Sequence, residues 1–135
     1  MQTHPAVREI IDLHDFFQAW LTASLPDEEA VFARFTRVTA PDFTLISPDG
    51  QPLDSAAVAA WIRAAHGSRP GFQLWTTDHT VCYEDGRCVL ATYLEWQRHN
   101  GTTTCRISSV LFHTDAGAPH GLLWQHVHET WRTAG

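Results

Sequence analysis

The segment Leu122-Leu123-Trp124-Gln125-His126-Val127-His128-Glu129-Thr130-Trp131 contains two tryptophans, two histidines that are two residues apart, and one carboxylate. We predict that it forms a β-strand, in which successive side chains point to opposite faces. On this pattern one face carries Trp124, His126, His128 and Thr130. The other face carries Leu123, Gln125, Val127, Glu129 and Trp131. We therefore expect the paired imidazoles and the carboxylate to lie on opposite sides of a sheet.

Three further long strands precede this segment. Apolar and β-branched residues predict strands over 72–83, 88–98 and 102–114, followed by the last strand over 121–132. The joints contain Asp85-Gly86 and Asn100-Gly101, two dipeptides that favour tight hairpin turns. The second half of the chain is therefore expected to form four consecutive antiparallel strands.

The first half is mainly helical. Apolar residues recur at three- and four-residue steps over 5–23, which predicts an amphipathic helix. A second, shorter helix should open at Pro26-Asp27-Glu28-Glu29, in a region that Pro41 is expected to end. A short hairpin over 42–53 turns at Pro48-Asp49-Gly50-Gln51, and a third helix follows over 56–65. Helices followed by long antiparallel strands predict an α+β fold.

Composition excludes several classes of function. The 135 residues predict a single domain, 1–135, and the net charge of −6 without any lysine argues against a nucleic-acid surface. No stretch predicts a membrane span, a membrane-binding helix or a signal peptide, so we expect a cytoplasmic protein with no membrane partner. Cys82, Cys88 and Cys105 lack metal-ligand spacing and are expected to be free thiols.

Three motifs, in the order of these elements, carry a resemblance to a known superfamily. They are Ala40-Pro41-Asp42-Phe43 before the first strand, Ser47-Pro48-Asp49-Gly50 at the first turn, and Leu122 to His128 in the closing strand. The chain resembles the nuclear-transport-factor-like superfamily, and its ending His128-Glu129-Thr130-Trp131 is most similar to bacterial SnoaL-like proteins. The resemblance implies a cone-like curved antiparallel sheet wrapped around the N-terminal helices. It also implies an apolar pocket in the mouth of the cone and a homodimer, commonly formed through the outer sheet face.

Glu95 and Tyr93 are the first candidates for chemistry. They lie two residues apart in one predicted strand and therefore share a face. If that face is the concave one, we expect burial to raise the pKa of Glu95 and make it a general base or acid. Tyr93 could then donate a hydrogen bond to an oxyanion, a pairing that ketosteroid isomerase, one member of this superfamily, uses. The tyrosine and aspartate positions of that superfamily do not match this sequence, whose first helix has no tyrosine. The alternative is a solvated or dimer-facing glutamate beside a structural tyrosine.

His126 and His128 have three interpretations. They could act as catalytic or substrate-binding imidazoles, or they could pack and form hydrogen bonds on the outer sheet face. They could also bind a metal, which would require a third ligand such as His113, Glu95 or Glu129. No second motif supplies that ligand, so we expect no metal and no cofactor.

The remaining candidates are expected to bind a ligand: His14, Phe17, Trp61, Glu129 and Trp131. His14 lies near the apolar stripe of the first helix and is either a pocket residue or a core histidine. Glu129 is either a pocket acid or a buried carboxylate paired with Arg106 or Arg63. Either face of the long strands could be the concave one, since both carry apolar and polar residues.

Two function hypotheses therefore remain open. One is a cofactor-independent acid–base enzyme of the isomerase, cyclase, dehydratase or hydrolase type, acting on a small hydrophobic or aromatic compound. The other is a ligand-binding or association module without catalysis. A titrating group that governs ligand binding between about pH 5 and 8 would favour the enzyme, whereas a plain apolar pocket predicts none.

Overall fold

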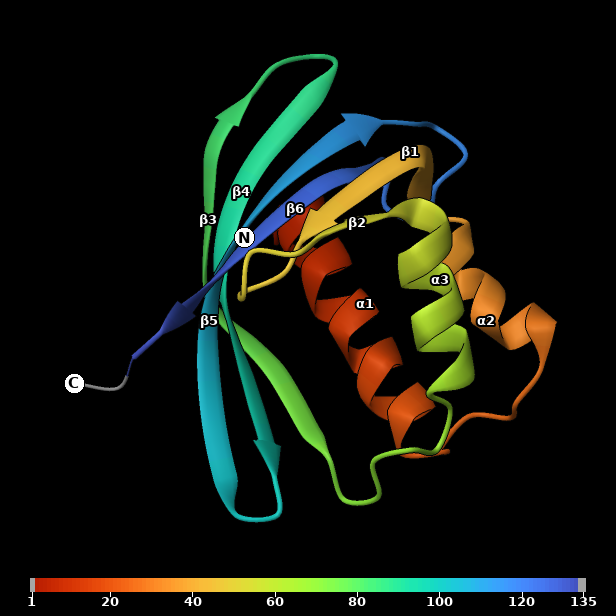
Figure 1. Ribbon diagram of the computed structural model, residues 1–135. Helices are drawn as coiled ribbons and strands as arrows, with labels where there is room; N and C mark the ends of the chain where they lie inside the picture. Colours follow the sequence, from red (N-terminus) through yellow and green to blue (C-terminus); the bar gives the residue numbers. More distant parts are fainter. Residues whose placement is uncertain (1, 134–135) are drawn as a thin grey trace.

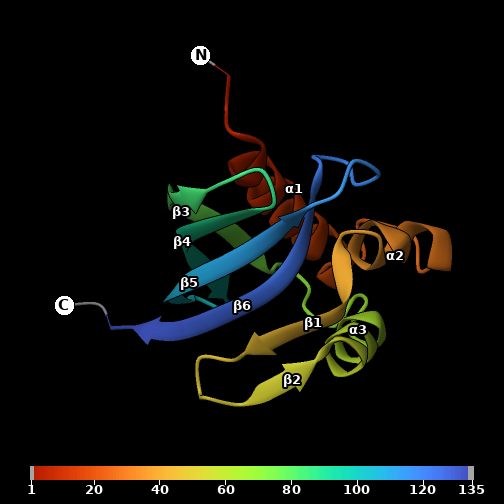
Figure 2. The same ribbon diagram turned by 90° about the horizontal axis from the view of Figure 1, so that it is seen from above.

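Six strands form one curved, unclosed sheet with three helices on its concave side (Figures 1 and 2). The computed structural model describes residues 2–133. Its elements in chain order are α1 Pro5–Leu21, α2 Glu29–Thr36, β1 Thr39–Ile46, β2 Pro52–Asp54, α3 Ser55–Ala64, β3 Gln73–Glu84, β4 Cys88–His99, β5 Thr102–Thr114 and β6 Leu122–Arg132. The predicted α+β fold with a curved sheet around N-terminal helices is confirmed.

The strand order in the sheet is β2-β1-β6-β5-β4-β3. All neighbouring strands are antiparallel except β1 and β6, which run parallel. The hairpin between β4 and β5 turns at Asn100 and Gly101, which have φ angles of 52° and 80°. Two consecutive positive φ angles are what a tight hairpin turn requires, and asparagine and glycine tolerate them best.

Helix α1 supplies the core that the sheet encloses. His4 caps it by accepting a hydrogen bond from the backbone N–H of Ala6 at 3.0 Å, and Pro5 opens its first turn. The helix buries a stripe that includes Ile10, Leu13 and Trp20 and packs against β3. Because this stripe follows the helical period, burial of one face holds the helix in the mouth of the sheet.

A buried carboxylate ties α1 to α2 and β6. Glu9 is fully buried and accepts two hydrogen bonds from Nη2 of Arg34, at 3.0 and 3.2 Å. It also accepts one from Nε1 of Trp124 at 2.9 Å. Burial raises the pKa of Glu9, although these partners partly offset that effect. The three elements are therefore joined by hydrogen bonds as well as by apolar packing.

Two expectations about the strands are wrong. Strand β1 begins at Thr39, so Pro41 lies inside it and does not mark its start.

The face predicted for Trp124 is also wrong, because β6 contains a bulge. Trp124 pairs with Phe112, whereas His126 pairs with the adjacent residue Leu111, which leaves Gln125 as an extra residue. A bulge reverses the alternation of side chains, and Trp124 consequently shares the concave face with Val127 and Glu129.

The longest helix, α1, has 17 residues. Among residues 2–133, no helix has both the length and the apolar character that crossing a membrane would require.

Candidate functional site

The main cavity lies between the concave face of the sheet, α1, α3 and the β1–β2 hairpin. Its volume is about 680 Å³, which is the size of a pocket for a small organic molecule. Its walls are mainly apolar and include Leu13, Phe17, Phe35, Phe43, Leu45, Val58, Ile62, Phe72 and Leu74. Trp61 on α3 stands at its edge and is 63% exposed.

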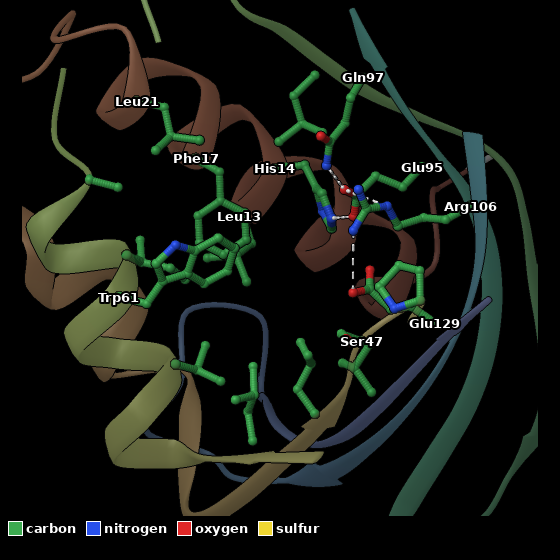
Figure 3. A pocket seen from close by; sticks show the side chains of 18 of the residues that line it. Leu13, His14, Phe17, Leu21, Ser47, Trp61, Glu95, Gln97, Arg106 and Glu129 are labelled. Atoms are coloured by element: carbon green, nitrogen blue, oxygen red, sulfur yellow. Dashed lines mark hydrogen bonds and ion pairs between the residues drawn. The ribbon is translucent and has the colours of Figure 1, made fainter. Parts of the chain in front are cut away.

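Charged side chains gather at one end of this apolar pocket (Figure 3). We call His14, Glu95, Arg106 and Glu129 the charge cluster. Glu95 and Arg106 are cross-strand partners on β4 and β5, and Ser108 of β5 is the partner of Glu129 on β6. Because Arg106 and Ser108 are two residues apart, both pairs point to the concave face. His14 reaches the same place from α1.

His14 and Glu95 form a buried ion pair. Nε2 of His14 lies 2.9 Å from Oε1 of Glu95, and Nδ1 lies 2.7 Å from the backbone carbonyl of Ile10. Both neighbours are hydrogen-bond acceptors, so both ring nitrogens must carry hydrogen to satisfy them. Burial lowers the pKa of His14, but the hydrogen bond and charge of Glu95 outweigh burial and leave that pKa raised. The imidazole is therefore held as the cation.

Arg106 lies between two carboxylates without a hydrogen bond to either. Its Nε atom is 3.7 Å from Oε2 of Glu95, and its Nη1 atom is 3.5 Å from Oε1 of Glu129. The guanidinium lies over the ring of Trp131, 4.7 Å from the ring centroid. Among residues 2–133, its buried Nε atom has no hydrogen-bond partner. The pairing of Glu129 with Arg106, one of the two partners proposed from the sequence, is confirmed.

The two glutamates of the charge cluster have pKa values shifted in opposite directions. Burial alone would raise the pKa of Glu95, but His14, Arg106 and a 2.6 Å hydrogen bond from Gln97 lower it to about 2. Burial and the charge of Glu95 raise the pKa of Glu129 to about 7, despite Arg106 nearby. Glu95 is therefore a fixed anion, and Glu129 can gain or lose a proton near neutral pH.

This result corrects the expected pKa shift of Glu95. Burial was predicted to raise it, and the prediction is wrong because the cation of His14 reaches Glu95 from α1. Nothing in the strand pattern indicates that contact. Gln97 was missed as well, although its position two residues after Glu95 on the same strand places it on the same face.

Seven of the nine predicted site residues line the pocket: His14, Phe17, Trp61, Tyr93, Glu95, Glu129 and Trp131. Tyr93 is buried, its ring lies in a T-shaped arrangement with His14 at 5.3 Å between centroids, and burial raises its pKa well above the usual value. The roles of these seven residues in catalysis or binding stay predictions. Trp131 also donates a hydrogen bond from Nε1 to Asp49 at 2.8 Å, which ties β6 to the β1–β2 hairpin.

His126 and His128 lie outside the pocket on the convex face of the sheet. Nδ1 of His126 is 2.7 Å from Oγ1 of Thr44, and His128 is exposed. Their strand position directs them away from the charge cluster, so the pocket role proposed for them does not fit this geometry. Within the described part of the chain, no group of three or more His, Cys, Asp or Glu side chains is arranged to hold a metal ion.

Comparison with known proteins identifies the family. Residues 6–133 match the model of the family described as sucrose-6-phosphate phosphohydrolase C-terminal. The chain belongs to this family. Over 134 residues it is 22% identical to sucrose-phosphatase 2 and to sucrose-phosphatase 1 of Nicotiana tabacum. The match covers 97% of the chain but 32% of each relative, so the chain spans about a third of the length of these curated relatives.

Solved structures place this member of the sucrose-6-phosphate phosphohydrolase C-terminal family in the predicted superfamily. An NTF-2-like protein of unknown function from Pseudomonas aeruginosa is 25% identical, with a TM-score of 0.86 over 96% of this chain and 99% of that one. The CaMKII hub of S. rosetta is 16% identical, with a TM-score of 0.70 over 98% of both chains. The nuclear-transport-factor-like assignment is therefore confirmed, while the finer comparison with SnoaL-like proteins stays a prediction.

Proposed function

We propose that the protein binds a small hydrophobic or aromatic molecule in this pocket and transfers a proton to or from it. Glu129 is the proposed acid or base, without a cofactor. One observation carries the proposal: two buried carboxylates flank Arg106 at the end of an apolar cavity, and their pKa values are shifted apart. Paired carboxylates tuned in this way are suited to acid–base chemistry.

The other members of the charge cluster have supporting roles in this proposal. Burial and the negative charge of Glu95, which His14 holds ionised, together raise the pKa of Glu129 to about 7. Arg106 is positioned to hold an oxygen atom of the bound molecule and to stabilise negative charge there. The phosphohydrolase activity in the family name is not part of the proposal, because the chain spans about a third of the length of the sucrose-phosphatases it matches.

Hydrogen exchange tests this assignment. We expect the protein to accelerate proton exchange or water loss in some member of a panel of small aromatic ketones and hydroxy ketones, with and without a carboxylate, followed by NMR in deuterated water. Glu129→Gln should reduce that rate by about 100-fold or more, because general acid–base catalysis contributes on this scale. His126→Gln, on the convex face, is the matched control and should keep the rate. An equal rate in Glu129→Gln and the wild type would contradict the proposal.

The partner proposed for the convex face is a second copy of the chain. Three large apolar side chains are exposed there: Trp75 at 39%, Leu90 at 36% and Ile107 at 45%. Trp75 stacks on Trp96 across β3 and β4, with centroids 6.2 Å apart, which extends the apolar surface. An exposed apolar patch of this kind commonly marks an interface. The similarity to a CaMKII hub also favours self-association, so the association module remains the second candidate function.

Sedimentation equilibrium tests the dimer. We expect the wild type to have twice the mass of one chain, and Ile107→Arg to weaken association by more than about tenfold because it places a charge at the centre of the interface. Ile11→Arg is the matched control, since Ile11 is 37% exposed on α1 and away from the sheet face. A wild-type protein that sediments as a monomer, or equal weakening by both variants, would exclude this interface.

A further inference from the structure

Arg106 has hydrogen-bonding capacity that the protein itself does not use. Its side chain is 14% exposed, its contacts to Glu95 and Glu129 are 3.7 and 3.5 Å long, and its buried Nε has no hydrogen-bond partner among residues 2–133. A guanidinium presents its donors in a planar fork that matches two oxygen atoms of one group. A buried donor without a partner is costly. The Nη atoms are not fully buried and also form no hydrogen bond among residues 2–133, so they are the donors that a ligand oxygen would reach.

The charge balance around Arg106 depends on the proton of Glu129. Glu95 is neutralised by the His14 cation, and each of its oxygens already accepts a hydrogen bond, from His14 and from Gln97. Glu129 is then the remaining carboxylate that can balance Arg106. When Glu129 is protonated, the charge cluster has one net positive charge, and both Arg106 and the carboxyl group of Glu129 offer hydrogen-bond donors. The hydrogen-bond donors that Arg106 and protonated Glu129 offer are therefore suited to an anion and not to an amine.

The shape of the pocket restricts what that anion can be. The charge cluster lies at one end of the cavity, and the aromatic side chains of Phe17 and Trp61 line the space beyond it (Figure 3). A ligand with its oxygens on Arg106 would extend an apolar or aromatic body between α1 and α3. A doubly charged phosphate is disfavoured, because the charge cluster with Glu129 protonated has one net positive charge and balances only one of the two negative charges.

We infer that the pocket takes a monocarboxylate with an apolar or aromatic body, which binds with its carboxylate on Arg106 and with a proton on Glu129. This inference rests on the proposed function for the pocket itself, but not on catalysis. It adds the chemical class of the ligand and a dependence of binding on pH. The carboxylate and the proton enter together, so that the charge of the cluster with its ligand stays balanced.

Several ionisable groups besides Glu129 could contribute to a pH dependence. Those that face it or line the same pocket are His14 on α1, Asp49 on the β1–β2 hairpin, Arg69 after α3, Tyr93 and Glu95 on β4, and Arg106 on β5. Arginine side chains do not lose their charge in proteins, and burial raises the pKa of Tyr93 well above its usual value. His14 is the main competitor, since its pKa is raised as well. A variant at Glu129 separates the two.

Calorimetric titration with three matched probes tests the inference. The probes are 3-phenylpropanoate, its neutral amide 3-phenylpropanamide and the cation 3-phenylpropylamine. We expect the wild type to prefer the carboxylate by about tenfold or more at about pH 6, and its affinity to fall by up to about tenfold per pH unit above neutrality. Titration at about pH 8 in phosphate and in Tris should show uptake of about one proton per bound carboxylate.

Two variants assign the effect to its residues. Glu129→Gln is neutral at every pH, so it should bind the carboxylate with an affinity that no longer changes between about pH 6 and 8, and without proton uptake. Arg106→Lys keeps the positive charge but lacks the planar fork, and it should lose about tenfold in carboxylate affinity, a larger loss than for the amide, which presents one oxygen atom. Retained pH dependence in Glu129→Gln would assign the proton to His14 and overturn the inference.

The probes also separate this inference from the proposed function. Equal binding of the amide and the carboxylate would overturn the ligand class while leaving a small-molecule pocket in place. Tighter binding of the amine would overturn it as well, because it would show that the cluster acts as an anion. If no probe bound at any pH, the pocket itself would fail as a ligand site, and the proposed function would fail with it.

Discussion

Replacing Arg106 by methionine (Arg106→Met) should lower the free energy of unfolding by about 3 to 5 kcal/mol at about pH 8, because it removes the cation that two buried carboxylates share. Glu95 and Glu129 are 7% and 8% exposed, so water cannot replace the lost charge. Glu95 keeps His14 as a partner, whereas Glu129 would have no cation left within 4 Å among residues 2–133. Urea unfolding at matched protein concentration measures the loss.

The pH dependence of this loss identifies the carboxylate responsible. At about pH 5 Glu129 is protonated in the folded protein, so Arg106→Met should cost clearly less there than at about pH 8. Adding Glu129→Gln to Arg106→Met should recover most of the stability lost at the higher pH. Arg106→Lys should cost about 1 kcal/mol, since it keeps the charge. An equal loss for Arg106→Met at both pH values would mean that Glu129 is not responsible, and that the loss comes from Glu95 or from packing on Trp131.

Most of the fold could be predicted from the sequence because its signals are local. The helical stripe of α1 repeats over several turns, and Asn100-Gly101 specifies a tight turn whatever surrounds it. Each long strand was correctly located because its turn residues lie at both ends. The parallel pairing of β1 with β6 joins segments about 80 residues apart, and no local pattern indicates it.

The site was predicted only in part, because its geometry depends on two non-local features. The bulge at Gln125 decides that Trp124 shares a face with Glu129, and strict alternation predicts the opposite. The packing of α1 in the sheet brings His14 to Glu95, 81 residues later, and that contact reverses the expected pKa shift. Residue types and strand positions identify Glu95 and Glu129 as candidate site residues. Their different ionisation depends on neighbours that only the folded chain supplies.

Glu129→Gln should make the protein more stable than the wild type by about 2 to 3 kcal/mol at about pH 8, and no more stable at about pH 5. The pKa of Glu129 is raised from the ordinary 4.5 to about 7 in the folded protein. Between these values the folded protein holds a proton that the unfolded chain has released, so stability falls as pH rises through this window. Glutamine has no proton to lose, and its variant therefore avoids the penalty.

Chemical unfolding of both proteins from about pH 5 to 8 measures this difference directly, and subtracting the two curves cancels the ionisation of groups that the substitution does not affect. Glu28→Gln, at an exposed carboxylate before α2, is the control and should run parallel to the wild type. Parallel curves for Glu129→Gln would mean that Glu129 ionises as an ordinary glutamate. It would then hold no proton near neutral pH, and both its role in proton transfer and the coupled uptake of a carboxylate would be excluded together.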